Sequence, residues 1–173
     1  MRKLISAALL CLAAQAAFAL EVTGVAPAQI KGAAMGDFSF GPVTVKSVAW
    51  EQGAVVLPLT DNKGKKYANL KLLSKAAYTK LEACFKNGFV KPAKAPARPV
   101  VKVEALKPLK SPARVANAEI SFDGDLLAVA GVMASRKEEG TFWVAFPPDL
   151  EFTDPAFKSA VESAVIAAWT KKK

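Results

Sequence analysis

Histidine is absent from this 173-residue chain, and cysteine is almost absent. The lack of histidine excludes Ser-His-Asp catalysis, histidine metal ligands and imidazole acid–base chemistry. Cysteine occurs only at Cys11 and Cys84, which excludes the cysteine clusters of structural zinc sites. The sequence also has no glycine loop of the type that cradles phosphates. Because these common arrangements are missing, we expect a non-enzymatic protein that uses no cofactor and no metal.

The N-terminus has the three parts of a secretory signal. Arg2 and Lys3 precede an apolar run over residues 4–16, and Ala17-Phe18-Ala19 is a small-x-small cleavage site. The apolar run is shorter than the roughly 20 residues that a membrane-spanning helix needs, and no later stretch is long enough. We therefore expect residues 1–19 to be a signal peptide cleaved after Ala19. The mature chain is then secreted or periplasmic and has no transmembrane segment.

Cleavage would remove Cys11 and leave Cys84 as the one remaining thiol, so no disulfide could form within the mature chain. Cys84 falls on the apolar face of a predicted helix, where free cysteine behaves as a small hydrophobic residue. We expect a buried, inert thiol.

The positive charge is concentrated in two short regions. The leader holds two of the 24 basic residues and none of the 15 acidic ones, so the mature chain carries +7. Residues 20–89 carry +4, residues 90–114 carry +6, residues 115–170 carry −6, and the tail of residues 171–173 carries +3. A chain with an acidic second half is not a uniformly basic nucleic-acid binder.

Residues 20–89 form the first predicted unit. Apolar runs separated by turn residues predict strands over residues 20–25, 38–40, 43–48 and 54–57, with a turn over residues 61–66. A helix is predicted to begin after the N-cap Ser74 and to end at Asn87-Gly88. Its apolar face contains Ala77, Leu81, Cys84 and Phe85.

Residues 90–113 form a predicted linker rich in proline, alanine and lysine, which should be extended and semi-rigid. Its residues 100–103 are a candidate start of the second unit's first strand. The linker is either a solvated spacer or a second contact for anionic polymers.

Residues 114–170 form the second predicted unit, followed by the basic tail of residues 171–173. Strands are predicted over residues 116–122, 126–133 and 141–146. Asp123-Gly124 is a strong hairpin signal, which explains Asp123-Gly-Asp125 better than a metal motif does. Asp154-Pro155 should open a helix, with an apolar stripe of Phe157, Val161, Ala164, Val165 and Ala168 and with Trp169 on its flank.

The two units share one order of elements. Residues 38–40 match 120–122, residues 43–48 match 127–132, residues 53–58 match 140–147, and Leu81-x-x-Cys84-Phe85 matches Val161-x-x-Ala164-Val165. The pattern predicts an α+β fold of two tandem units, each a small antiparallel β-sheet followed by one amphipathic helix. The two units could together form an internal pseudo-dimer in a monomeric protein. The alternative is a chance likeness of β-hairpin patterns.

Several of these segments resemble the septation protein SpoVG family. The resemblance is carried by Gly140-Thr-Phe-Trp-Val-Ala-Phe-Pro147, by Glu151-Phe-Thr-Asp154, and by the helical stripe that ends at Trp169. Val55-Val-Leu-Pro58 and Gly64-Lys-Lys-Tyr67 resemble it in the first unit. The resemblance implies a SpoVG-like fold and association with nucleic acid and regulation. The family's His-Pro after the aspartate is missing from both units, and family members are cytosolic single units.

Basic residues gather between the last predicted strand and the helix of the first unit. The candidate polyanion-binding residues are Lys63, Lys65, Lys66, Tyr67, Lys71 and Lys75, with Tyr67 as a stacking residue. The alternative is a soluble basic loop and helix start. We predict an exported, non-enzymatic, SpoVG-like binding or structural module of the cell envelope, whose partner is an anionic envelope polymer, a lipid surface or a protein. The alternative is a SpoVG-like nucleic-acid-binding regulator linked to cell division and septation.

Overall fold

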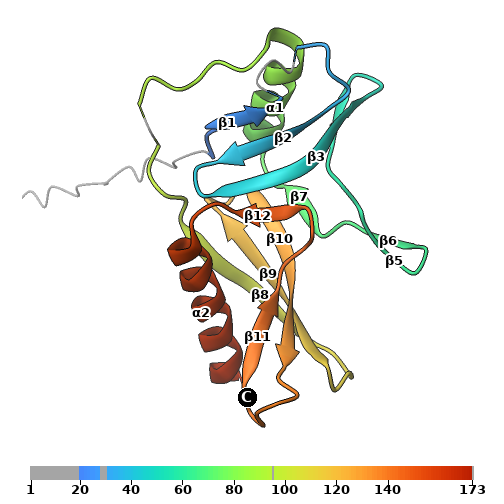
Figure 1. The fold of residues 1–173 in the computed structure, drawn as a ribbon, viewed down its shortest axis with the longest axis vertical. Helices are drawn as coiled ribbons and strands as arrows, with labels where there is room; N and C mark the ends of the chain where they lie inside the picture. Colours follow the sequence, from blue (N-terminus) through green and yellow to red (C-terminus); the bar gives the residue numbers. More distant parts are fainter. Residues whose placement is uncertain (1–19, 28–30, 95, 173) are drawn as a thin grey trace, which may run out of the picture.

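A computed structural model of the chain describes residues 20–27, 31–94 and 96–172. The signal peptide predicted over residues 1–19 lies outside the described residues, as does Lys173 of the predicted tail. Within these ranges the structure is α+β, with mostly antiparallel sheets and two helices, which confirms the predicted fold class (Figure 1). In this part of the chain, neither helix is long and apolar enough to cross a membrane.

The elements follow one another in two similar series. The first is β1 (Gly24–Ala26), β2 (Met35–Phe40), β3 (Val43–Glu51), β4 (Ala54–Val56), β5 (Thr60–Asn62), β6 (Lys65–Tyr67), β7 (Leu70–Leu72) and α1 (Lys75–Asn87). The second is β8 (Val101–Pro108), β9 (Arg114–Phe122), β10 (Leu126–Ala134), β11 (Phe142–Ala145), β12 (Leu150–Phe152) and α2 (Pro155–Lys172).

Two short strands cross between the two main sheets. The first sheet has the order β1-β2-β3-β12, with β4 also on β3, and the second has the order β8-β9-β10-β11, with β7 also on β10. The first sheet therefore includes β12 from the second half of the chain, which places Leu150 opposite Val45. The second sheet includes β7 from the first half, which places Leu72 opposite Leu126. Each sheet is thus completed by the other half of the chain.

Backbone hydrogen bonds flank both ends of each crossing strand. Lys46 N donates to Asp149 O (2.8 Å) and Val129 N to Asn69 O (2.8 Å), while Thr153 N donates to Pro42 O (3.0 Å) and Leu73 N to Asp125 O (2.7 Å). These bonds continue the strand pairing beyond the ladders. They also give partners to backbone N–H and C=O groups that would otherwise be buried and unpaired.

Both helices begin at the caps that the sequence predicts. Ser74 Oγ accepts from Ala77 N (3.1 Å), and Asp154 Oδ1 accepts from Phe157 N (3.2 Å). Such caps satisfy backbone donors that have no partner within the helix. Helix α1 ends at Gly88, whose φ of 89° suits glycine. Helix α1 packs on β4 and β7, and α2 packs on β8, β11 and β12 (Figure 1).

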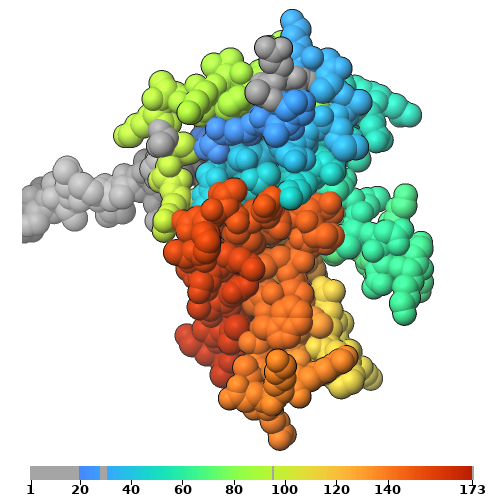
Figure 2. Space-filling view, viewed as in Figure 1, coloured from blue at the N-terminus to red at the C-terminus, as the bar shows by residue number. Residues whose placement is uncertain are grey.

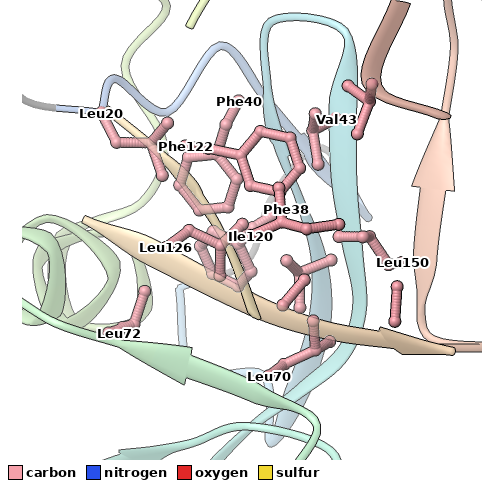
Figure 3. Packing of buried hydrophobic residues seen from close by; sticks show 14 of the residues in the cluster. Leu20, Phe38, Phe40, Val43, Leu70, Leu72, Ile120, Phe122, Leu126 and Leu150 are labelled. Atoms are coloured by element: carbon pink, nitrogen blue, oxygen red, sulfur yellow. The ribbon is translucent and has the colours of Figure 1, made fainter. Parts of the chain in front are cut away.

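One continuous hydrophobic core runs through both sheets and both helices. Figure 3 shows its centre, where Phe38 and Val43 of the first sheet lie with Ile120 and Phe122 of the second. The crossing strands add Leu70, Leu72 and Leu150 to the same cluster. The two halves therefore share a single core rather than each burying its own.

Aromatic rings join each helix to its sheet. The Phe85 ring of α1 lies 5.2 Å from that of Phe38 and stacks on Trp50 at 5.6 Å. The Trp169 ring of α2 meets Phe142 edge-on at 6.2 Å. Such pairs add roughly 0.5–1.5 kcal/mol each beyond the area that they bury.

The predicted linker over residues 90–113 is wrong in its second part. Residues 101–108 form strand β8, which pairs along β9 and places Val103 opposite Ile120. The alternation of apolar and polar residues after Val101 supplies the strand pattern, and β8 is an edge strand. Pro108 is tolerated there because it stands at the end of an edge strand, where a missing N–H costs little.

Other details of the sequence prediction also need correction. The first strand begins at Gly24 and not at Leu20, and the short strands β5, β6, β7 and β12 were not predicted. Ala164 is exposed, so the buried stripe of α2 is Phe157, Val161, Val165 and Trp169.

The shared core predicts cooperative unfolding. Leu126→Ala removes a fully buried side chain from the centre of the core and should lower the free energy of unfolding by about 2–5 kcal/mol. Leu73→Ala, at a side chain that is 51% exposed, is the control and should change it by about 0.5 kcal/mol or less. Urea unfolding followed by tryptophan fluorescence and by circular dichroism should give one coincident transition. Two separated transitions would contradict a shared core.

Candidate polyanion-binding hairpin

The predicted basic residues 63–67 form a hairpin that stands away from the body of the protein. Strands β5 and β6 pair only with each other, with Asp61 opposite Lys66. Lys63 and Gly64 form the turn, and both have positive φ values of 54° and 79°. These values match the two-residue turns that suit the twist of a hairpin. Figure 2 shows the hairpin as a separate projection beside the two packed sheets.

The turn is held by a side chain of the hairpin itself. Asp61 Oδ1 accepts a hydrogen bond from Gly64 N at 3.0 Å. An aspartate that bonds a backbone amide three residues later is a common way to fix a turn. The hairpin therefore keeps its shape with little support from the core.

The two faces of β6 carry different side chains, because successive residues of a strand point to opposite sides. Lys65 and Tyr67 lie on one face, and Lys66 lies on the other, opposite Asp61. All of them are exposed, and Tyr67 is 45% exposed. The face with Lys65 and Tyr67 thus offers a cation and an aromatic ring two residues apart.

Lys71 and Lys75 lie on the elements that follow the hairpin. Lys71 is the exposed middle residue of β7, between the buried Leu70 and Leu72. Lys75 is the first residue of α1, and the first turn of that helix contains no acidic residue. The helix N-terminus adds its own partial positive charge beside Lys75. The structure therefore places the six candidate residues on one hairpin, one strand and one helix start that are consecutive in the chain.

The five lysines are not neutralised by acidic partners within the described ranges. The ion pairs found there use other basic residues, namely Lys46, Lys80, Lys86, Arg98, Lys102, Lys107 and Lys158. Unpaired exposed lysines leave positive potential for a mobile anionic partner. We call Lys63, Lys65, Lys66 and Tyr67 the basic hairpin surface; Lys71 and Lys75 lie on the elements that follow it.

Asp123-Gly124-Asp125 is a hairpin turn in the structure, as the sequence predicts. Asp123 Oδ1 accepts from Val100 N (2.7 Å), and Asp125 Oδ2 accepts from Leu20 N (2.8 Å). Burial is the main influence on the Asp123 carboxyl and raises its pKa. Across the described residues, no group of three or more His, Cys, Asp or Glu side chains is placed to hold a metal ion.

One hollow in the described part of the chain was not predicted from the sequence. It has a volume of about 740 Å³ and lies between the start of the described chain and the proline-rich connector, which is the first part of the linker predicted over residues 90–113. Leu20, Phe40, Pro96 and Pro99 are among the residues that line it. Basic and acidic side chains both border the hollow, and Arg98 is paired with Asp154 at 2.7 Å, so its charges favour no single class of ligand. The sequence signal for it was the run of prolines that keeps the connector extended.

Comparison with protein-family models, with curated proteins and with solved structures finds no match to this chain. The resemblance to the SpoVG family therefore stays a prediction.

Cys84 provides a direct test of the packing of α1. The residue is 7% exposed, and burial raises the pKa of its thiol, so the reactive thiolate should be scarce. A thiol reagent at pH 8 should react with the native protein at least about tenfold more slowly than with the urea-unfolded chain. The control is Cys84→Ala combined with Ala83→Cys, which moves the thiol to an exposed position on the same helix. Equal native rates for the two proteins would contradict the buried position.

Proposed function

We propose that the chain is an exported, non-enzymatic binding module of the cell envelope whose basic hairpin surface contacts an anionic polymer. The observation that carries this proposal is the projecting hairpin, which presents exposed lysines with no acidic partner among the described residues. The predicted signal peptide supports the location, because a chain with such a leader meets envelope polymers before it meets nucleic acid.

The physical basis of such binding is the release of counterions from a charged polymer. Each phosphate, sulfate or carboxylate that a lysine neutralises frees a condensed cation, so affinity falls steeply as salt rises. A hairpin that stands away from the core can approach a polymer from several directions. Binding of this kind selects for charge density and reads little of the polymer's detailed structure.

Nucleic acid is the alternative partner, and one observation favours it. Tyr67 shares a face of β6 with Lys65. Proteins that bind single-stranded nucleic acid combine aromatic rings, on which bases stack, with basic residues that contact the phosphates. In that case the protein is a SpoVG-like regulator linked to cell division and septation. Its leader would then not direct export.

We further infer that the two halves reproduce a two-fold dimer within one chain, as tandem SpoVG-like units. The strand orders β1-β2-β3-β12 and β8-β9-β10-β7 agree element by element, and each half lends one strand to the other. A constant spacing of 80 residues relates Leu70 to Leu150 and Ser74 to Asp154, and the same spacing relates the buried Leu81 to Val161. Two-fold dimers exchange identical elements in this reciprocal way.

An internal pseudo-dimer predicts a monomer in solution, because the contacts of the pseudo-interface are already made within the chain. Sedimentation or light scattering of residues 20–173 should give the mass of one chain at micromolar concentration. An obligate dimer would contradict the inference. A dimer that dissociates on dilution while the circular dichroism spectrum is unchanged would show a weaker additional contact and would leave the internal pairing intact.

Charge removal on the hairpin tests the proposed surface. The triple variant Lys63→Gln, Lys65→Gln and Lys66→Gln should bind heparin, used as a model anionic polysaccharide, at least roughly tenfold more weakly at low salt. The plot of log affinity against log salt should become shallower, by up to about 0.7 per lost phosphate contact on single-stranded DNA. Fluorescence anisotropy with labelled heparin and a 20-nucleotide DNA measures both quantities.

The matched control removes the same charge from paired lysines. Lys102, Lys107 and Lys158 each form an ion pair with a glutamate and lie outside the basic hairpin surface. The control variant combines Lys102→Gln, Lys107→Gln and Lys158→Gln. An equal loss of affinity in this control would attribute binding to net charge and would contradict the proposed surface. Stronger binding to DNA than to heparin, lost in Tyr67→Ala, would favour the nucleic-acid alternative.

A further inference from the structure

The backbone of Leu20 is held by two charged side chains. Its N–H donates to Asp125 Oδ2 at 2.8 Å, and its carbonyl oxygen accepts from Lys80 Nζ at 3.0 Å. Its side chain is 2% exposed and belongs to the shared core (Figure 3). Asp125 comes from the loop after β9 and Lys80 from α1, so both halves of the chain hold this residue.

Asp125 is a fixed and buried partner. The residue is 8% exposed, its N–H donates to Phe122 O (3.0 Å), and its carbonyl oxygen accepts from Leu73 N (2.7 Å). The ion pairs of the described residues give its carboxylate no cation. An ammonium group at the position of the Leu20 amide would add an attractive charge interaction with this carboxylate.

We propose that the bond between Ala19 and Leu20 is a processing site and that the α-ammonium group released there pairs with Asp125. This inference rests on the proposed export. Hydrolysis breaks the bond between Ala19 C and Leu20 N. Water adds its hydroxide to the carbonyl carbon of Ala19, while Leu20 N keeps the bonding electron pair and takes the remaining proton of water. The new carboxylic acid then gives its proton to the amine, so the products at neutral pH are a carboxylate and an ammonium group. The donor already faces Asp125, so cleavage adds a charge without requiring Leu20 to move.

The geometry also gives the order of events. A peptidase binds the residues on both sides of the bond that it cuts, and Leu20 is buried once the chain has folded. Cleavage therefore precedes folding, as it does for a chain processed during export. After cleavage, the Leu20 side chain enters the core, and the ammonium group supplies the missing cation for Asp125. The cleavage position is specific, because an N-terminus one residue earlier places the charge about 3.8 Å further along the chain.

Three purified forms test the pair. The first begins at Leu20 with a free amine, the second is acetylated only at Leu20 N, and the third keeps Ala19 as its first residue. All three can donate from Leu20 N to Asp125, but only the first places an ammonium group there. The free-amine form should melt higher than the other two by roughly 5 °C.

A second background isolates the charge. In Asp125→Asn, which has nearly the same shape, the three forms should melt within about 1 °C of one another. A free-amine form no more stable than the acetylated form in the native background would overturn the proposal. An equal difference in both backgrounds would also overturn it. Where Asp125→Asn does not fold, the comparison of free and acetylated amine in the native background decides alone.

Cell fractionation with N-terminal sequencing separates this inference from the proposed function. An envelope protein that begins at Leu20 supports both. An envelope protein that begins at another residue overturns the processing site and leaves export intact. A cytosolic protein that retains Met1 overturns both.

Discussion

The structure depends on the exchange of two short strands. Strand β7 completes the second sheet and β12 completes the first, so neither sheet is finished by its own half of the chain. Each crossing strand carries leucines into the shared core, which ties the packing of one half to the backbone pairing of the other. Each crossing strand has only three residues and pairs with a longer strand of the sheet that it joins, β7 with β10 and β12 with β3. The shared core and the exchanged strands therefore predict cooperative unfolding.

The exchange also explains why the basic hairpin surface projects from the two main sheets. The chain must pass from β4, on the first sheet, to β7, on the second, and β5 and β6 lie within this passage. Because β4 and β7 pair with other strands and not with the hairpin, the side chains of the hairpin are not constrained by sheet packing. Lys71 then follows on the crossing strand itself, where its neighbours Leu70 and Leu72 are buried and it alone faces solvent. A surface arranged in this way couples an exposed binding element to the core through one strand.

Local signals in the sequence were sufficient for both helices and for the Asp123-Gly124 turn, but not for strands β5 and β6 or for the pairing of strands into sheets. Ser74, Gly88 and Asp154 act within a few residues, so capping and helix ends could be predicted from the sequence. The crossing of β7 onto β10 could not, because three residues carry too little pattern and their partners are more than 50 residues away. The lysines of the hairpin were recognisable as a group, whereas the projection that exposes them is set by tertiary structure. The bond between Leu20 and Asp125 spans 105 positions and had no sequence signal at all.

Asp125 connects Leu20 to the strand exchange. Its carboxylate holds Leu20 N, and its carbonyl oxygen holds Leu73 N at the end of β7. Movement of the loop after β9 would therefore disturb both the hydrogen bond to Leu20 N and the pairing of β7. Beside the other crossing strand, Thr153 N donates to Pro42 O, and proline carries no carboxylate. Asp125 thus places a carboxylate beside β7, and that carboxylate is where a processed N-terminus would stabilise the fold.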